Sequence, residues 1–270
     1  MALSDLKDLG ILAGLTSIVL VIISFVLGLY FIIRSFEGKN FERQRFLTGI
    51  GIIGLGGTWF GGVIQFLLII LTGDYLDVKL HTYLIAWAPA LASLVWIFLV
   101  FSLVKPEWRN YAMISISIVT LAFLIFTYGL VSLGDIETST RDNGETKVNL
   151  VDGISEQSIS NDSGFPNQRY LGIPGLIIAL YVVLLILLVG GVFLWTSIRT
   201  QSLEIKWKAR LVGFGVVVYG FIATIDAFLD PIAVVIILTR FLIICSFFLI
   251  ALGYTLPKWF RSRIGVHSSS

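Results

Sequence analysis

The chain has 270 residues and a formal net charge of +2, and it is 57% hydrophobic and only 13% charged. Its mean hydropathy of +0.93 lies far above that of a water-soluble domain of this length. These values exclude a soluble globular protein and predict an integral membrane protein whose first partner is the lipid bilayer. Because the apolar segments occupy almost the whole chain, we expect neither a separate catalytic domain nor a nucleic-acid partner.

Apolar runs bounded by charges and turn residues predict seven membrane-spanning helices. About 20 apolar residues are enough to cross a bilayer, and each run reaches that length. The runs cover residues 10–33, 46–72, 81–104, 110–133, 174–198, 209–229 and 231–254. We therefore expect an all-α fold, a seven-transmembrane-helix bundle formed by residues 1–263, with a short cytoplasmic tail at 264–270.

The distribution of lysine and arginine predicts the orientation. One set of loops, together with the tail, carries most of these residues: Arg34, Lys39, Arg43, Arg45, Lys105, Arg109, Arg199, Lys206, Lys208, Arg210, Lys258, Arg261 and Arg263. The opposite set carries fewer: Lys7, Lys79, Arg141, Lys147 and Arg169. Since basic loops remain in the cytoplasm, we expect the N-terminus outside and the C-terminus cytoplasmic, in the plasma membrane.

The single long connection, residues 134–172, is polar and acidic and is expected outside. Within it, the β-prone stretches IETST and TKVNLV flank Asn143-Gly144, and Asn-Gly between such stretches is a hairpin signal. The alternative is a disordered loop, because an isolated two-stranded hairpin is only marginally stable. Asn161 lies in an Asn-Asp-Ser triplet that fits the glycan-acceptor pattern.

The second apolar run is rich in glycine. Its glycines are Gly49, Gly51, Gly54, Gly56, Gly57, Gly61 and Gly62. Small residues four positions apart allow helix backbones to approach closely in membranes. This pattern favours tight internal packing, and the alternatives are a homodimer face or a flexible helix beside a cavity.

The last apolar run contains one arginine, Arg240, well inside it. A charge at membrane depth costs on the order of 2.5–3.5 kcal/mol on insertion scales and needs a partner, a cavity or an interface. Asp226 is the expected partner, because the short turn at Asp230-Pro231 makes the last two helices antiparallel neighbours. Gln65 and Trp87 are predicted near the same outer level.

Three interpretations of Arg240 remain open. It forms a buried salt bridge with Asp226, supported by Thr239, Gln65 and water, that fixes the last hairpin. Alternatively, it binds an anionic group in an outward-facing pocket, with Arg240, Asp226, Gln65 and Trp87 as ligand-binding residues. In the third, it faces lipid and extends toward the headgroups.

Catalytic signatures are missing from the sequence. The two histidines, His81 and His267, lie at a predicted outer helix end and in the tail, so the usual histidine-carboxylate metal cluster cannot form within the membrane. No glycine-rich phosphate loop or G-x-S-x-G motif occurs. We therefore expect no enzyme activity, metal or cofactor.

With seven predicted helices, the N-terminus outside and short basic inner loops, the chain resembles seven-helix receptors and rhodopsins in topology. Its motifs differ from theirs. Arg240 is the charged residue of the seventh run, where rhodopsins carry the retinal lysine, and the third run ends in Ser102-Leu103-Val104-Lys105 instead of an acidic-Arg-Tyr triplet. The chain also resembles the seven-helix sensor regions that precede microbial kinase domains, a likeness that implies a separate effector.

The function expected from these features is that of a receptor-like sensor. It would bind a small molecule or lipid in an outward-facing pocket and signal to a cytoplasmic effector protein. The first alternative is a carrier or channel for a small anionic solute that uses Arg240. The second is a structural membrane scaffold built on the glycine-rich helix.

Overall fold

The computed structural model describes residues 8–37, 41–74, 76–104, 106–133, 136–140, 146–150, 155–159, 166–170, 176, 179–180, 182–228 and 233–264. Most of these residues lie in long apolar helices. The helices are α1 (Asp8–Arg34), α2 (Arg43–Gly57), α3 (Phe60–Thr72), α4 (Val78–Val104), α5 (Arg109–Leu133), α7 (Val192–Arg199), α8 (Leu203–Phe228), α9 (Ala233–Thr255) and α10 (Lys258–Arg263). A 3₁₀ turn, η2 (Pro106–Trp108), precedes α5, and a π-helical segment, η4 (Leu185–Gly191), runs into α7.

Six of the helical segments are long and apolar enough to cross a membrane, and the bent pair α2 and α3 makes a seventh if it counts as one span. Large apolar side chains cover their outer surface, with Val26 on α1 60% exposed and Ile118 on α5 65% exposed. A soluble protein rarely exposes apolar surface on this scale. The chain is therefore a helical membrane protein, as the composition predicts.

The second apolar run is not one continuous helix, which corrects the prediction for residues 46–72. It bends by 50° between α2 and α3, at Thr58-Trp59. At the break the amide of Trp59 donates to the carbonyl of Gly56, 3.1 Å away, instead of to that of Leu55 four residues earlier. The break therefore leaves the Leu55 carbonyl without its helical donor.

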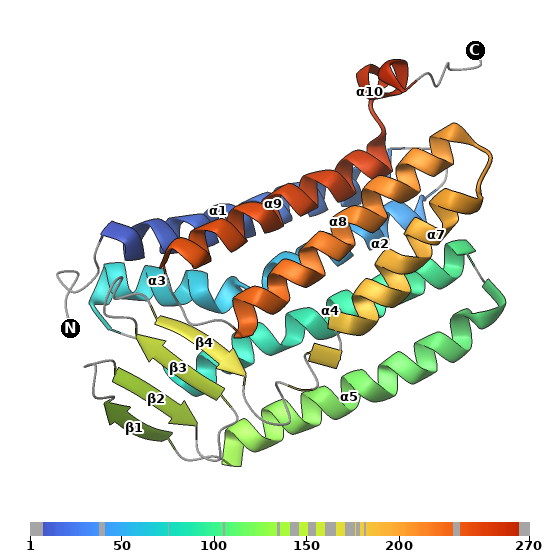
Figure 1. The fold of residues 1–270 in the computed structure, drawn as a ribbon. Helices are drawn as coiled ribbons and strands as arrows, with labels where there is room; N and C mark the ends of the chain where they lie inside the picture. The colour runs from blue at the N-terminus through green and yellow to red at the C-terminus, as the bar shows by residue number, and fades with distance from the viewer. Residues whose placement is uncertain are drawn as a thin grey trace.

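The helices pack in a circuit that brings the first and last of these spans, α1 and α9, side by side. In contact order it runs α1, α2 with α3, α4, η4 with α7, α8, α9 and back to α1, while α5 packs against α4 at the side of the bundle (Figure 1). The start of α1 and the strands lie at one end, here called the sheet end. The end of α9 and α10 lie at the opposite end, here called the tail end (Figure 1).

A four-stranded antiparallel sheet, in the order β1-β2-β3-β4, occupies the 134–172 connection. The strands are β1 (Ile136–Thr140), β2 (Thr146–Leu150), β3 (Ser155–Ile159) and β4 (Pro166–Tyr170). Ile136 pairs with Leu150 and Thr140 with Thr146, which confirms the predicted hairpin. The all-helical expectation thus holds for the apolar runs but not for this connection. Asn143-Gly144 and Asn161 lie outside the described residues.

The glycines of the second run allow close contacts within the chain. A Cβ atom at Gly49 would lie 2.5 Å from the carbonyl oxygen of Gly28 on α1, and one at Gly57 would lie 3.0 Å from the Trp87 ring on α4. Only hydrogen at these positions permits such approach. At Gly62, by contrast, an added Cβ would meet nothing within 4 Å. Most of the glycine surface is thus used inside this chain, which favours the internal-packing interpretation over a homodimer face.

Candidate functional site

Asp226 of α8 and Arg240 of α9 form a buried ion pair. The Nη1 atom of Arg240 donates to the Oδ2 atom of Asp226, and the two side chains are only 4% and 10% exposed. The pairing follows from the antiparallel packing of α8 and α9, which are adjacent in the bundle. The structure therefore contains the pair of Asp226 and Arg240 that the sequence predicts.

Asp226 accepts two further hydrogen bonds from different parts of the chain. The indole Nε1 of Trp59, at the break between α2 and α3, donates to Oδ2 at 2.9 Å. The hydroxyl of Thr239 donates to Oδ1 at 2.8 Å. A buried carboxylate is tolerated when its lone pairs are occupied in this way. Asp226 therefore has three donors, one of them a cation.

Arg240 has partners on two more helices. Its Nε atom donates to the hydroxyl of Ser17 on α1 at 3.2 Å, and its guanidinium carbon lies 5.3 Å from the centroid of the Trp59 ring. We refer to Ser17, Trp59, Asp226, Thr239 and Arg240 as the polar hub. The hub joins α1, the α2–α3 break, α8 and α9 in the interior of the bundle.

Tyr219 of α8 supports the hub from the next turns of that helix. Its hydroxyl donates at 3.1 Å to the Leu55 carbonyl, the acceptor released by the helix break. Its ring lies edge-on to Trp59, with centroids 6.0 Å apart, and stacks on Phe247 of α9. Inside a bilayer a freed backbone carbonyl needs such a replacement donor. Tyr219 therefore stabilises the bent form of the second run.

The hub has the pattern expected of a buried ion pair that is retained for specificity. Removing two charges from water costs several kcal/mol per ion, and only good geometry with additional hydrogen bonds offsets this cost. The bonds from Trp59, Thr239 and Ser17 supply those additions. The arrangement fixes the relative positions of four segments. It therefore favours the salt-bridge interpretation over the interpretation in which Arg240 binds an anionic ligand.

Among the described residues, neither Gln65 nor Trp87 forms a hydrogen bond or ion pair with a hub residue. The Oε1 atom of buried Gln65 accepts from the amide of Leu76 at 3.0 Å and so ties α3 to the segment that precedes α4. Its Nε2 atom is buried without a hydrogen-bond partner in the part of the chain that the structure describes. Trp87 packs on Gly57 of α2. The expected bond between Gln65 and Arg240 is not among the hydrogen bonds of the described residues, where Ser17 and Asp226 are the partners of Arg240.

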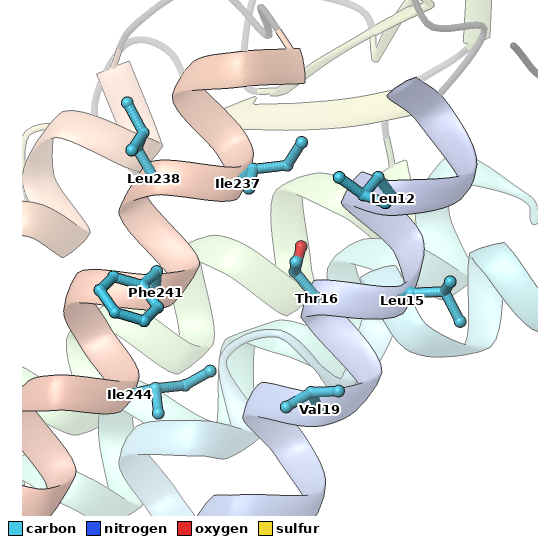
Figure 2. Close-up of a pocket in the computed structure, with 8 residues that line it drawn as sticks. All are labelled: Leu12, Leu15, Thr16, Val19, Ile237, Leu238, Phe241 and Ile244. Carbon is cyan, nitrogen blue, oxygen red and sulfur yellow. The ribbon is translucent and has the colours of Figure 1, made fainter. Parts of the chain in front are cut away.

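An apolar groove of about 360 Å³ lies beside the hub, between α1 and α9. Figure 2 shows the side chains of Ile237 and Ile244 on α9 pointing toward α1. The lining residues are Leu12, Leu15, Thr16, Val19, Ile237, Leu238, Phe241 and Ile244. Ser17 and Arg240, which are buried, adjoin groove residues in sequence. Their hydrogen bond therefore joins the same two helices on the buried side of the groove.

Sequence reasoning missed Ser17 and Trp59. Ser17 resembles the other small polar residues of apolar helices, so nothing in its position distinguished it. Trp59 carried a signal, because tryptophan is enriched at membrane interfaces and this one lies in the middle of an apolar run. A mid-run indole needs an acceptor for its N–H, and that requirement could have directed attention to Asp226.

Comparison with known proteins finds no family model that matches the chain and no curated protein similar to it. Among the described residues, no group of three or more His, Cys, Asp or Glu side chains could hold a metal ion.

Proposed function

We propose that this chain is a receptor-like membrane sensor with seven spans, its N-terminus outside and its C-terminus in the cytoplasm. The excess of lysine and arginine in the loops at the tail end supports this orientation. Counting α2 and α3 as one bent span gives the odd number of crossings that it requires. The sheet then lies on the outer face, and the cytoplasmic partner would bind at the tail end.

The observation that carries the proposal is the Arg240–Ser17 hydrogen bond behind the groove. A ligand that enters the groove and separates α1 from α9 would lengthen this bond. Arg240 also binds Asp226, which in turn binds Trp59 at the helix break. Movement at the groove would thereby reach the bend between α2 and α3, which we propose as the two-state element that signalling requires.

The proposed ligand is an apolar chain, such as the hydrocarbon of a fatty acid or lipid. The groove is open toward the outside of the bundle, and Leu12, Leu238 and Phe241 are each roughly half exposed there. In a bilayer this surface faces hydrocarbon. Because Arg240 is already paired with Asp226, we propose the groove residues as the ligand-binding site in place of the hub residues. The hub would then respond to ligand bound in the groove.

Oleate added to the protein in a neutral detergent tests binding. We expect it to raise the thermal unfolding temperature, since a ligand that binds only the folded state stabilises it by mass action. Val19→Trp fills the groove and should abolish the shift. Val26→Trp is the matched control, an exposed valine of the same helix outside the groove lining, and it should retain the shift. Equal loss in both variants would contradict a groove site.

Transmission needs a second measurement. Spin labels at positions 36 and 259, both exposed at the tail end, with Cys245→Ser as background, report the distance between the segment just after α1 and α10, the short helix that follows α9. Oleate should change the distance distribution in the parent and not in Ser17→Ala, which keeps the groove but loses the bond to Arg240. Binding without any change in the parent would refute the sensor and leave only a lipid-binding protein.

A carrier for a small anionic solute is the second candidate, and the broken second span favours it. Discontinuous spans with their half-helix ends near the middle of the membrane form the substrate sites of many transporters. Here the break adjoins Asp226 and Arg240, the only described charge pair in the bundle interior. Flux of a small carboxylate into proteoliposomes, abolished by Arg240→Gln in folded protein, would favour the carrier over the sensor.

A further inference from the structure

Two arginines from different helices converge on one aromatic ring at the tail end. The guanidinium carbon of Arg43, the first residue of α2, lies 4.6 Å from the centroid of the Phe98 ring on α4. That of Arg109, the first residue of α5, lies 5.5 Å from the same centroid. The ring therefore holds two positive charges from separate segments close together.

Among the described residues, the nearby acids leave Arg43 and Arg109 without carboxylate partners. Neither arginine forms an ion pair with any residue that the structure describes, while Glu42, beside Arg43, pairs with Arg45 at 3.0 Å. Glu107, on the turn before α5, is exposed. The first turns of α2 and α5 also lack acidic residues. Because a helix N-terminus carries partial positive charge, an arginine there adds to the unfavourable potential, which a bound anion would relieve.

A hydroxyl donor lies one turn further along the same face of α4. Ser102 is four residues after Phe98, so their side chains are neighbours on the helix. The Oγ atom of Ser102 is buried and has no hydrogen-bond partner among the described residues. A buried hydroxyl without a partner calls for an explanation, such as a group that the chain itself does not supply. Two guanidinium groups and, one turn along α4 from the ring that they share, a hydroxyl without a described partner therefore lie in the same part of the bundle.

The other arginines of this end show that the convergence is particular. Arg34 pairs with Glu37 at 2.5 Å, and Arg261 lies 3.4 Å from Glu204. Arg199 lies 4.5 Å from the Trp195 ring, with no second cation recorded on that ring. The general excess of positive charge in these loops does not explain why Arg43 and Arg109 share one ring. Two arginines on one ring therefore require their own account.

We propose that Arg43, Arg109 and Ser102 form a binding site for the phosphate of an anionic phospholipid. Two planar guanidinium groups and a hydroxyl match the several acceptor oxygens of a phosphate. The site lies where apolar spans end, and exposed Trp108 and Phe41 nearby suit the level of the headgroups. Arg43, on the helix that leads to the break, and Arg109, on α5, would be linked through the bound lipid.

The test measures the affinity of fluorescent phosphatidic acid for the protein in neutral detergent. The double variant Arg43→Gln/Arg109→Gln should bind about 100-fold more weakly, since each charge-assisted contact is worth roughly tenfold. Ser102→Ala should lose about threefold, as expected for one neutral hydrogen bond. We expect both variants to remain folded, because Arg43 is exposed and Arg109 is half-buried. The unfolding temperature measured without lipid checks this expectation.

Arg199→Gln is the matched control, since it removes one arginine that contacts an aromatic ring at the same end. It should leave the affinity for phosphatidic acid within about twofold, as a change outside the site. An equal loss in the control would reduce the site to diffuse surface charge and overturn the proposal. Displacement of the lipid by equimolar inorganic phosphate would overturn the assignment to a lipid. Neither result depends on the oleate groove.

Discussion

The two halves of the second apolar run, α2 and α3, are held by different interactions. Along α2, the main interactions are close backbone contacts that only glycine permits, such as the contact of Gly49 with Gly28 of α1. At the break before α3, hydrogen bonds of side chains dominate, with Trp59 bound to Asp226 and the Leu55 carbonyl to Tyr219. Close packing tolerates no added atom, whereas a hydrogen-bonded hinge can exchange partners. We infer that α2 is a fixed element and the break is the adjustable one.

The largest predicted effect tests the hub. Asp226→Leu leaves Arg240 buried without its counter-ion and should destabilise the protein by about 3–5 kcal/mol, the usual consequence of removing one partner of a buried pair. Arg240→Leu should act similarly. Chemical denaturation in detergent, followed by circular dichroism, gives the free energy of unfolding where the transition is reversible.

The double variant Asp226→Leu/Arg240→Leu supplies the decisive control. Without either charge, the desolvation cost disappears and stability should return to near the parent value. If the double variant remained as unstable as either single variant, the ion pair would not be the source of the effect, and the hinge would depend mainly on packing.

The next effect tests the packed half. Gly49→Ala places a Cβ atom 2.5 Å from the Gly28 carbonyl oxygen, so the backbone of α1 must move. We expect a loss of about 1–3 kcal/mol, the range for overpacking. Gly62→Ala is the matched change in α3, where the new methyl group meets nothing within 4 Å. It should be neutral or stabilising by up to about 1 kcal/mol through helix propensity. Equal unfolding temperatures for the two variants would contradict the proposed division of roles.

The smallest effect concerns the replacement donor at the break. Tyr219→Phe removes the hydrogen bond to the Leu55 carbonyl while keeping the ring contacts with Trp59 and Phe247. Loss of this buried bond should cost about 1 kcal/mol. Tyr111→Phe, at a position 73% exposed, should change nothing measurable. Amide exchange at residues 56–60 should rise in the first variant alone, and unchanged exchange would argue that Tyr219 does not hold the bend.

The sequence predicted the apolar helices well, because the length of a hydrophobic run follows from the thickness of a bilayer. Six runs correspond to candidate spans, and the hairpin between Ile136 and Leu150 is also present. The break at Thr58-Trp59 and the strands β3 and β4 were not predicted. With glycine at seven positions between 49 and 62, the sequence did not single out one place for the bend, and the donor that replaces the lost helical bond, Tyr219, comes from another helix.

The candidate site was predicted in part. The Asp226–Arg240 pair followed from one short connection between two spans, which fixes neighbours in space. Gln65 and Trp87 were placed by depth alone, and depth does not specify the side of a helix on which a residue packs. Ser17 joins the hub from the far end of the sequence, through the packing of α1 on α9.

By itself, the sequence determined that the chain enters a membrane, which of its segments are apolar enough to do so, and that a buried arginine needs an acid. These properties depend on hydrophobicity, charge and segment length, which are local. The tertiary structure decided that Arg240 is already occupied, that Trp59 and Ser17 complete its environment, and that Arg43 and Arg109 share one ring. These depend on which helix faces meet, and only the packed bundle settles that.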